Sequence, residues 1–203
     1  MLLNVVSSCR PPPLSNKVTK ISKSREALIE HLVANSVRTD GPFTLRSGQV
    51  SDFYIDARQT TFDGEGAALA GAAVGEALLA EVVAVGGLTM GADPIAVAAA
   101  IVATTQHRRL RAFSIRKETK GHGTGGRLVG PVAAGDAVAI IDDTVTTGGA
   151  LLEAIEVARA EGLRVVQAIC LVDRSDGDLA RTLEDLAIPY TALVTPPALG
   201  VRA

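Results

Sequence analysis

The sequence has 203 residues, the length of one domain with room for a small appended unit. Hydrophobic residues make up 47% of it and charged residues 21%, a balance typical of a globular rather than a disordered chain. Its two cysteines, Cys9 and Cys170, exclude a disulfide framework and a cysteine-rich zinc site, and they favour a reducing compartment, so we expect a cytoplasmic protein. The longest strongly apolar stretch, residues 94–105, is too short to cross a membrane, which excludes a membrane protein.

The charge is distributed unevenly along the chain. The net charge of −2 argues against a nucleic-acid partner. Between His107 and Arg127, however, seven basic side chains accompany one acid, Glu118, so this window carries +6 and the rest of the chain −8. A cationic segment on an acidic body suggests a small polyanion, such as a phosphate or a diphosphate, as the ligand.

The predicted helices and strands begin after an irregular N-terminal segment. Residues 1–20 contain three consecutive prolines and little periodicity, and we expect a loose tail. A helix capped by Ser24 should end before Gly41-Pro42, and residues 52–58 alternate as a strand would. Further helices are expected over residues 64–82, from Asp93-Pro94 onward, after Gly148-Gly149 and over residues 179–186, with strands at 83–90, 112–115, 138–142, 164–172 and 190–194. This alternation predicts an α/β fold with a parallel sheet covered on both faces.

The segment Ala137–Glu153 (AVAIIDDTVTTGGALLE) is the most informative part of the chain. An apolar strand ends in Asp142 and Asp143, and hydroxyl residues and two glycines then open a helix. Backbone N–H groups in such a turn form a cradle for phosphate, and the helix dipole adds positive charge. The two acids would repel a phosphate but suit sugar hydroxyls or a metal ion nearby, so a phosphorylated ribose fits. The alternative is an ordinary turn whose Asp-Asp-Thr caps the helix; no lysine follows the glycines, which excludes a Walker loop.

A second motif lies in the cationic window, at Arg116-Lys117-x-x-Lys120-x-His122. Cations placed there would stabilise a departing diphosphate, and the five glycines in residues 117–130 suit a loop that closes over substrate and excludes water. The alternative is a solvated basic surface loop.

Together with Phe43–Arg58 (FTLRSGQVSDFYIDAR), these motifs resemble those of the orotate phosphoribosyltransferases, within the type I phosphoribosyltransferase family, over about residues 24–195. The resemblance implies a type I phosphoribosyltransferase fold in residues 21–203, with a mostly parallel central sheet flanked by helices, a small hood at about 21–60 and a core at about 61–195. It implies Mg²⁺-dependent transfer of the phosphoribosyl group from phosphoribosyl diphosphate (PRPP) to orotate, giving orotidine 5′-monophosphate and diphosphate in pyrimidine biosynthesis. It also implies a homodimer in which residues 116–126 complete the neighbouring subunit's site.

The resemblance further assigns roles to single residues. Those expected to bind PRPP are Arg46, Arg116, Lys117, Lys120, His122, Asp142, Asp143, Thr144, Val145, Thr146, Thr147, Gly148, Gly149 and Ala150. Those expected to bind orotate are Tyr54, Ile55, Thr146 and Arg174, and those expected to be catalytic are Lys117, Lys120, His122 and Asp143. Mg²⁺ should be held mainly by PRPP oxygens and water, with no protein metal site.

Two positions depart from the family pattern. Arg46 stands where the family usually has lysine. The compact ammonium group of lysine is thereby replaced by a planar guanidinium group with several N–H donors. The loop at residues 89–94 lacks the Tyr-Lys pair of many members, so a PRPP contact there would be made by the backbone.

Two rival functions also remain. A purine-specific phosphoribosyltransferase would share the 137–153 cradle but not the Phe43–Arg58 segment, and a nucleotide-sensing regulator that binds RNA would need a second basic surface.

Overall fold

The structure is a computed structural model that describes residues 22–44, 50–118 and 126–201. Its centre is a six-stranded sheet in the order β10-β9-β8-β5-β6-β7. The strands are β5 (Ala84–Leu88), β6 (Arg111–Ile115), β7 (Leu128–Val129), β8 (Ala137–Val145), β9 (Arg164–Asp173) and β10 (Tyr190–Val194). All neighbours are parallel except β7, which pairs antiparallel with β6 at the edge. The predicted α/β class is therefore confirmed.

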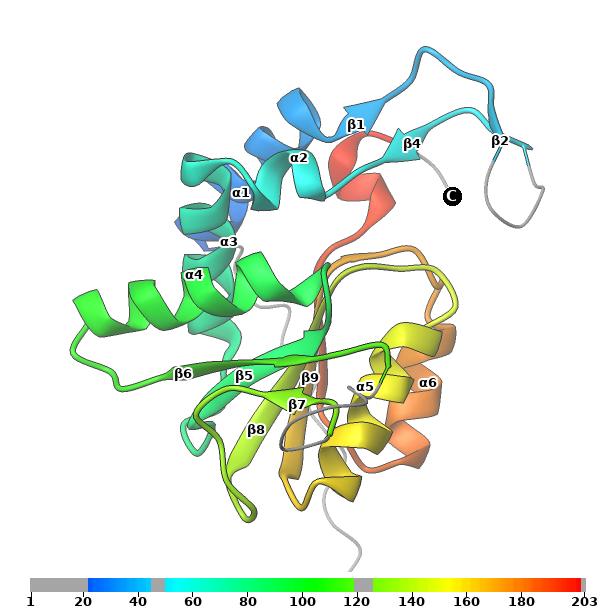
Figure 1. The fold of residues 1–203 in the computed structure, drawn as a ribbon. Coiled ribbons are helices and arrows are strands. Elements are labelled where there is room, and N and C mark those ends of the chain that lie inside the picture. Colours follow the sequence, from blue (N-terminus) through cyan, green and yellow to red (C-terminus); the bar gives the residue numbers. More distant parts are fainter. Residues whose placement is uncertain (1–21, 45–49, 119–125, 202–203) are drawn as a thin grey trace, which may run out of the picture.

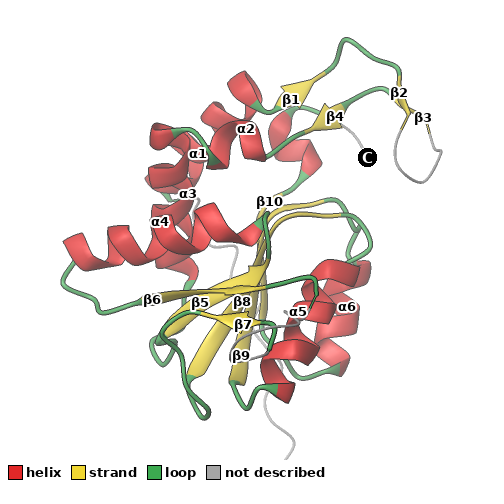
Figure 2. Ribbon diagram, in the orientation of Figure 1, coloured by secondary structure: helices red, strands yellow, loops and turns green. Residues whose placement is uncertain are grey.

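Two layers of helices cover the sheet (Figures 1 and 2). The helices α3 (Gly64–Ala77) and α4 (Ala92–Thr105) lie on one face, and α5 (Gly149–Ala160) and α6 (Asp178–Asp185) lie on the other. The alternation of β8 explains both layers: Ala139 and Ile141 belong to the core under α3 and α4, whereas Val138 and Ile140 belong to the core under α5 and α6. Because both faces are buried, the strand is apolar at every position up to Asp142.

The close contact between α3 and α4 depends on a glycine. A side-chain carbon at Gly71 would lie 2.7 Å from the backbone carbon of Ala98, closer than packing allows. The two helices therefore approach with no side chain between them at this point.

The first part of the chain forms small elements above the carboxyl edge of the sheet (Figure 1). They are α1 (Lys23–Asn35), β1 (Val37–Arg38), β2 (Phe43–Thr44), β3 (Val50–Ser51), β4 (Tyr54–Ile55) and α2 (Arg58–Thr61), and the 3₁₀ helix η1 (Pro196–Leu199) from the end of the chain lies beside them. β1 pairs with β4, and β2 pairs with β3, both antiparallel. The division into a hood and a core stays a prediction, and the expected tail at residues 1–20 lies outside the described residues.

Several predicted boundaries differ from the structure. The cap of α1 is Ser22, whose hydroxyl accepts from the Arg25 N–H, whereas Ser24 donates to Glu76 over 2.6 Å. The helix predicted over residues 64–82 ends at Ala77, and only Tyr54 and Ile55 of the strand predicted over 52–58 are in a ladder. β7 lies in a segment predicted as loop. Among the helices that the structure describes, none is long and apolar enough to cross a membrane.

Candidate active site

The predicted cradle lies where the strand order of the sheet reverses. The chain leaves β5 toward β6 on one side, and leaves β8 toward β9 and β10 on the other, so the carboxyl ends of β5 and β8 flank a crevice. Open α/β sheets bind ligands at such a switch point. Asp142, Asp143, Thr144 and Val145 end β8 there, and residues 146–148 form the turn into α5. Prediction and structure therefore agree on the strand, the turn and the helix of this motif.

The two acids of the motif are both held by the backbone. Asp142 accepts from the N–H of Asp143 over 3.0 Å, and Asp143 accepts from the N–H of Thr144 over 2.7 Å. Burial raises the pKa of Asp142 to about 7, and the neighbouring Asp143 carboxylate adds to this. Burial also raises the pKa of Asp143, although the backbone N–H of Thr144 and the charge of Arg58 oppose it. Positive charge beside Asp142 and Asp143 would stabilise their ionised forms, so a cationic ligand would be favoured there.

The turn after β8 is shaped to receive an anion. Gly148, the residue before α5, has φ +81°, a left-handed conformation that favours glycine, and a side-chain carbon there would lie 2.7 Å from Leu179 Cδ1. No side chain caps α5, so its first N–H groups have no capping partner among the described residues. Thr146, Thr147, Gly149 and Ala150 are exposed, and the buried hydroxyl of Thr144 has no hydrogen-bond partner within the described ranges. These donors can bind a phosphate.

The loop after β5 closes the other side of the crevice. A side-chain carbon at Gly91 would lie 2.6 Å from Asp143 Oδ1, so the backbone of this loop touches the carboxylate directly. The Thr89 hydroxyl donates to Asp93 over 2.5 Å within the same loop. The expected backbone contact of this loop with PRPP stays a prediction.

The predicted orotate residues come from two distant segments. Arg174 follows β9, and its N–H donates to the Val145 carbonyl over 2.8 Å, which places it beside the turn that carries Thr146. Its guanidinium carbon lies 4.9 Å from the ring centre of Phe53, which directly precedes Tyr54. Tyr54 is half-buried against Phe43, with ring centres 5.8 Å apart. Ile55 is buried in the core under α3 and α4. The structure thus brings Arg174, Thr146 and the 53–55 segment to one end of the sheet.

The cationic motif is described only in part. Arg116 and the exposed Lys117 follow β6 at the same carboxyl edge as the crevice, whereas Arg46, Lys120 and His122 lie outside the described residues. Arg127 joins the two ends of this loop: its Nε donates to the Arg116 carbonyl over 2.6 Å, and its guanidinium pairs with Glu153 of α5. The N–H of Arg116 also donates to the Arg127 carbonyl over 2.8 Å. The base of the loop is therefore fixed to α5.

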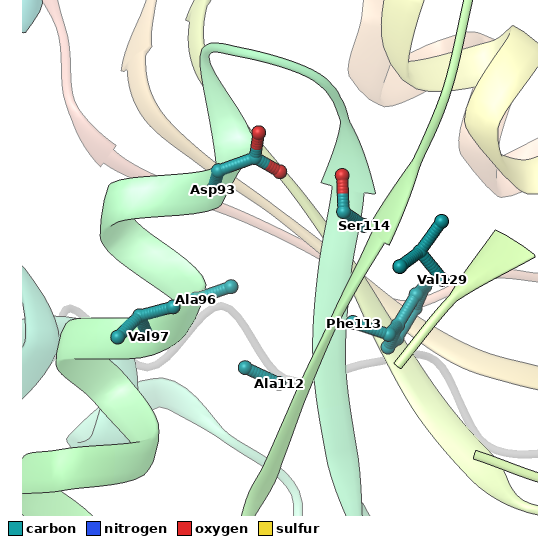
Figure 3. Close-up of a pocket in the computed structure, with 7 residues that line it drawn as sticks. All are labelled: Asp93, Ala96, Val97, Ala112, Phe113, Ser114 and Val129. Carbon is teal, nitrogen blue, oxygen red and sulfur yellow. The ribbon is translucent and has the colours of Figure 1, made fainter. Parts of the chain in front are cut away.

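A separate cavity of about 290 Å³ lies between α4 and β6 (Figure 3). Its walls are mostly apolar, with Val97 and Val129 on opposite sides, and the Asp93 carboxylate and the Ser114 hydroxyl lie together at one end. Asp93 Oδ1 is buried without a hydrogen-bond partner among the described residues. Val97 and Ile101, one helical turn apart on α4, are 51% and 62% exposed. This edge of the molecule is therefore unusually apolar for a surface.

The described ranges contain no group of three His, Cys, Asp or Glu side chains that could hold a metal ion. Cys170 is fully buried in β9, and burial raises the pKa of its thiol, as is typical of an unreactive core cysteine.

Sequence reasoning missed four residues at this site. Phe53 and Arg58 lie within the motif 43–58 but received no role, and Gly91 and Arg127 were treated only as loop residues. Arg58 pairs with Asp56 over 2.7 Å, and its pKa is raised by Asp56 and, to a lesser extent, by the charge of Asp143. The signal that could have drawn attention to Phe53 and Arg58 is an aromatic or charged residue within four positions of an assigned one.

Comparison with known sequences gives a consistent set of relatives. The orotate phosphoribosyltransferase of Streptomyces avermitilis is 40% identical over 182 residues, which cover 87% of this chain and 97% of the relative. That of Aquifex aeolicus is 40% identical over 173 residues, covering 83% and 93% of the two chains. No protein-family model matches the chain.

Solved structures give the same result. An orotate phosphoribosyltransferase of Mycobacterium tuberculosis, solved with PRPP, superposes with a TM-score of 0.74 at 30% identity and covers 88% of this chain and 99% of its own. The adenine phosphoribosyltransferase of Leishmania donovani, at 16% identity and a TM-score of 0.58, covers 85% of this chain and 81% of its own and shares the fold alone. The identities of the sequence relatives and their nearly complete coverage show that the chain belongs to the orotate phosphoribosyltransferase family.

Proposed function

We propose that this chain transfers the phosphoribosyl group of PRPP to orotate, giving orotidine 5′-monophosphate and diphosphate in pyrimidine biosynthesis. The observation that carries the proposal is the crevice itself: one buried and one half-buried carboxyl group and an uncapped helix N-terminus lie beside an arginine that contacts an aromatic ring. The names of the relatives support this choice of substrates.

PRPP would bind with its parts spread along the carboxyl edge of the sheet. The residues from Thr144 to Ala150 would hold the 5-phosphate, because they supply threonine hydroxyls and the backbone N–H groups at the uncapped start of α5. Asp142 and Asp143 would accept hydrogen bonds from the ribose hydroxyls. The diphosphate would then point toward the cationic loop, where the proposed contacts are Arg46, Arg116, Lys117, Lys120 and His122.

Orotate would bind between the hood segment and the end of β9. The planar guanidinium of Arg174 can bind its carboxylate bidentately, and Thr146 would donate to the ring. The Tyr54 side chain and the backbone of Ile55, whose side chain lies in the core, would pack against the pyrimidine. An acceptor base with no carboxylate would leave Arg174 buried without a partner, which disfavours it.

The proposed reaction breaks the bond between ribose C1 and a diphosphate oxygen and forms one between C1 and a ring nitrogen of orotate. The electron pair of the broken bond leaves with the diphosphate, and the proton of the ring nitrogen passes to solvent. As the first bond loosens, the ribose gains positive charge and the diphosphate gains negative charge. Asp143, with Asp142, would favour the cationic ring, and Lys117, Lys120 and His122 would stabilise the leaving group.

Mg²⁺ is the cofactor that we propose. The carboxylates of Asp142 and Asp143 and the Thr144 hydroxyl, which has no hydrogen-bond partner in the described part of the chain, are hard oxygen groups suited to it, but they are too few to form a protein cage. PRPP oxygens and water would therefore supply most of its ligands. When bound, the ion would neutralise charge on the diphosphate.

We also propose a homodimer in which residues 116–126 complete the site of the neighbouring subunit. The apolar edge around the 290 Å³ cavity supports a second copy as the occupant, because β6, from which the loop leaves, forms one of its walls. A cytoplasmic location is proposed as well, and a chain with only two cysteines supports it.

The decisive experiment is to follow the ultraviolet absorbance of orotate after addition of PRPP and Mg²⁺, with adenine, guanine and uracil assayed in parallel. Loss of the absorbance with orotate and no turnover of the other bases is the expected result. Turnover of another base would retain the PRPP site but refute the roles of Tyr54, Thr146 and Arg174. Omission of Mg²⁺ should abolish the reaction.

A further inference from the structure

Arg174 has no acidic partner among the described residues. Within the described ranges it forms no ion pair and no side-chain hydrogen bond, although it is half-buried. Burial lowers the pKa of its guanidinium group, and only the Tyr54 phenol opposes this. The N–H donors of the side chain are therefore available to a ligand.

Two carboxylates are close enough in sequence to compete for this arginine. Asp173 lines the same cavity of about 280 Å³ as Arg174, but its two oxygens accept from the Ser175 N–H over 2.7 Å and from the Tyr190 hydroxyl over 2.9 Å. Asp176 also lines this cavity and is exposed to solvent. Neither acid pairs with Arg174.

The contact that the structure does provide is aromatic. The Phe53 ring is 94% buried, since its exposed fraction is 6%, and its centre lies 4.9 Å from the guanidinium carbon of Arg174, within the distance of a cation–π interaction. Phe53 precedes β4, whereas Arg174 follows β9, so this contact connects the two segments proposed to contain orotate between them.

We propose that Phe53 is a positioning residue for substrate selection: its ring fixes the guanidinium plane of Arg174 so that two parallel N–H groups meet the carboxylate of the acceptor base. This inference rests on the proposed function, because it concerns the carboxylate contact of that same site.

The proposal is tested by comparing the binding of two nucleotides that differ only in this carboxylate, orotidine 5′-monophosphate and uridine 5′-monophosphate, by calorimetry. Phe53→Leu should weaken the first roughly ten-fold and leave the second unchanged, because only the first uses Arg174. Phe53→Tyr, which retains the ring, should restore the wild-type ratio. Phe113→Leu is the matched control, since Phe113 is equally buried but lies in the core under α5, and it should leave the ratio unchanged.

A double-mutant cycle then tests whether Phe53 acts through Arg174. In an Arg174→Met background, Phe53→Leu should cause no further loss of discrimination. Equal weakening of both nucleotides by Phe53→Leu, or a full additional loss in the Arg174→Met background, would overturn the positioning role. If Phe53→Leu does not fold, Phe53→Met serves in the same cycle.

The wild-type protein separates this proposal from the proposed function. Failure of wild type to prefer orotidine 5′-monophosphate, or to turn over orotate, would refute the function itself. A wild-type preference that Phe53→Leu retains would refute only the role of Phe53.

Discussion

The backbone N–H of Asp143 donates to the side chain of Asp142 over 3.0 Å, so the second acid of the pair helps to hold the first in a buried position. Burial keeps the pKa of Asp142 at about 7, well above the ordinary value near 4. A carboxyl group of this kind favours folding while it is protonated. That contribution is lost as the pH rises from about 4 toward the pKa of the folded state.

The first prediction concerns Asp142→Asn. The amide retains an acceptor for the Asp143 N–H but cannot ionise, so the variant should be more stable than wild type at pH 8 by roughly 1–3 kcal/mol. Its free energy of unfolding should also vary less between about pH 4 and 7 than that of wild type. Denaturant unfolding at several pH values measures both. Activity should fall sharply, and a variant that is less stable than wild type at pH 8 would contradict this account.

Gly91→Ala tests the contact between the loop after β5 and the acid pair. The added carbon would lie 2.6 Å from Asp143 Oδ1, so the carboxylate must move, and kcat/KM for PRPP should fall roughly ten- to hundred-fold. The φ of Gly91 is −63°, so alanine causes no backbone strain. Gly75→Ala is the control, because nothing lies within 4 Å of its added carbon, and it should leave activity intact.

Arg127→Met removes the side chain that joins the two ends of the cationic loop. The Arg116 carbonyl and Glu153 both lose a charged partner, and we expect kcat/KM to fall roughly ten-fold because Arg116 and Lys117 lose their fixed base. Steady-state kinetics measure this. Arg164→Met, which breaks an exposed pair with Glu81, is the matched control and should change little.

Lys117→Ala and Lys120→Ala test the leaving-group role of the loop. If these cations act mainly in the transition state, each variant should lower kcat roughly a hundred-fold while KM for PRPP changes much less. Lys23→Ala, on the exposed side of α1, serves as the control. A rise in KM with unchanged kcat would assign these lysines to ground-state binding instead.

Mixing two inactive variants tests the shared site. In a hybrid of Lys120→Ala and Arg174→Ala subunits, one of the two sites receives both intact contributions, so a random mixture should regain about a quarter of wild-type activity. A mixture that stays inactive after subunit exchange, verified by mass spectrometry, would show that each subunit uses its own loop.

The sequence predicted best what depends on local periodicity. β10 has its predicted bounds and β9 differs by one residue. The order strand, turn and helix at residues 137–160 agrees as well, because a fully apolar strand followed by Gly-Gly leaves few alternatives, although β8 extends to Val145, three residues beyond the predicted strand. The helix predicted to reach residue 82 ends at Ala77 because of a long-range contact: Gln167 of β9 accepts from the Leu79 N–H and donates to the Ala77 carbonyl. No local pattern encodes that partner.

The rest of the site depends on contacts between distant residues. Phe53 has an ordinary position beside a short strand until the fold brings it under Arg174. Gly91 becomes important only because β5 and β8 are neighbours in the sheet, although α4, β6 and β7 separate them in the chain. Two-residue strands such as β7 are too short for their own sequence to predict, since their partner strand supplies the ladder.

The phosphate side and the base side of the crevice differ in how far apart their residues lie in the sequence. The turn proposed to hold phosphate is one uninterrupted run of chain between β8 and α5, whereas Phe53 and Arg174 meet only after folding. Substitutions near residues 53–55 can therefore alter which ring is accepted without disturbing the phosphate turn. Variants with new acceptor bases should accordingly be sought by randomising the hood segment and Arg174 together, with the 142–150 segment left unchanged.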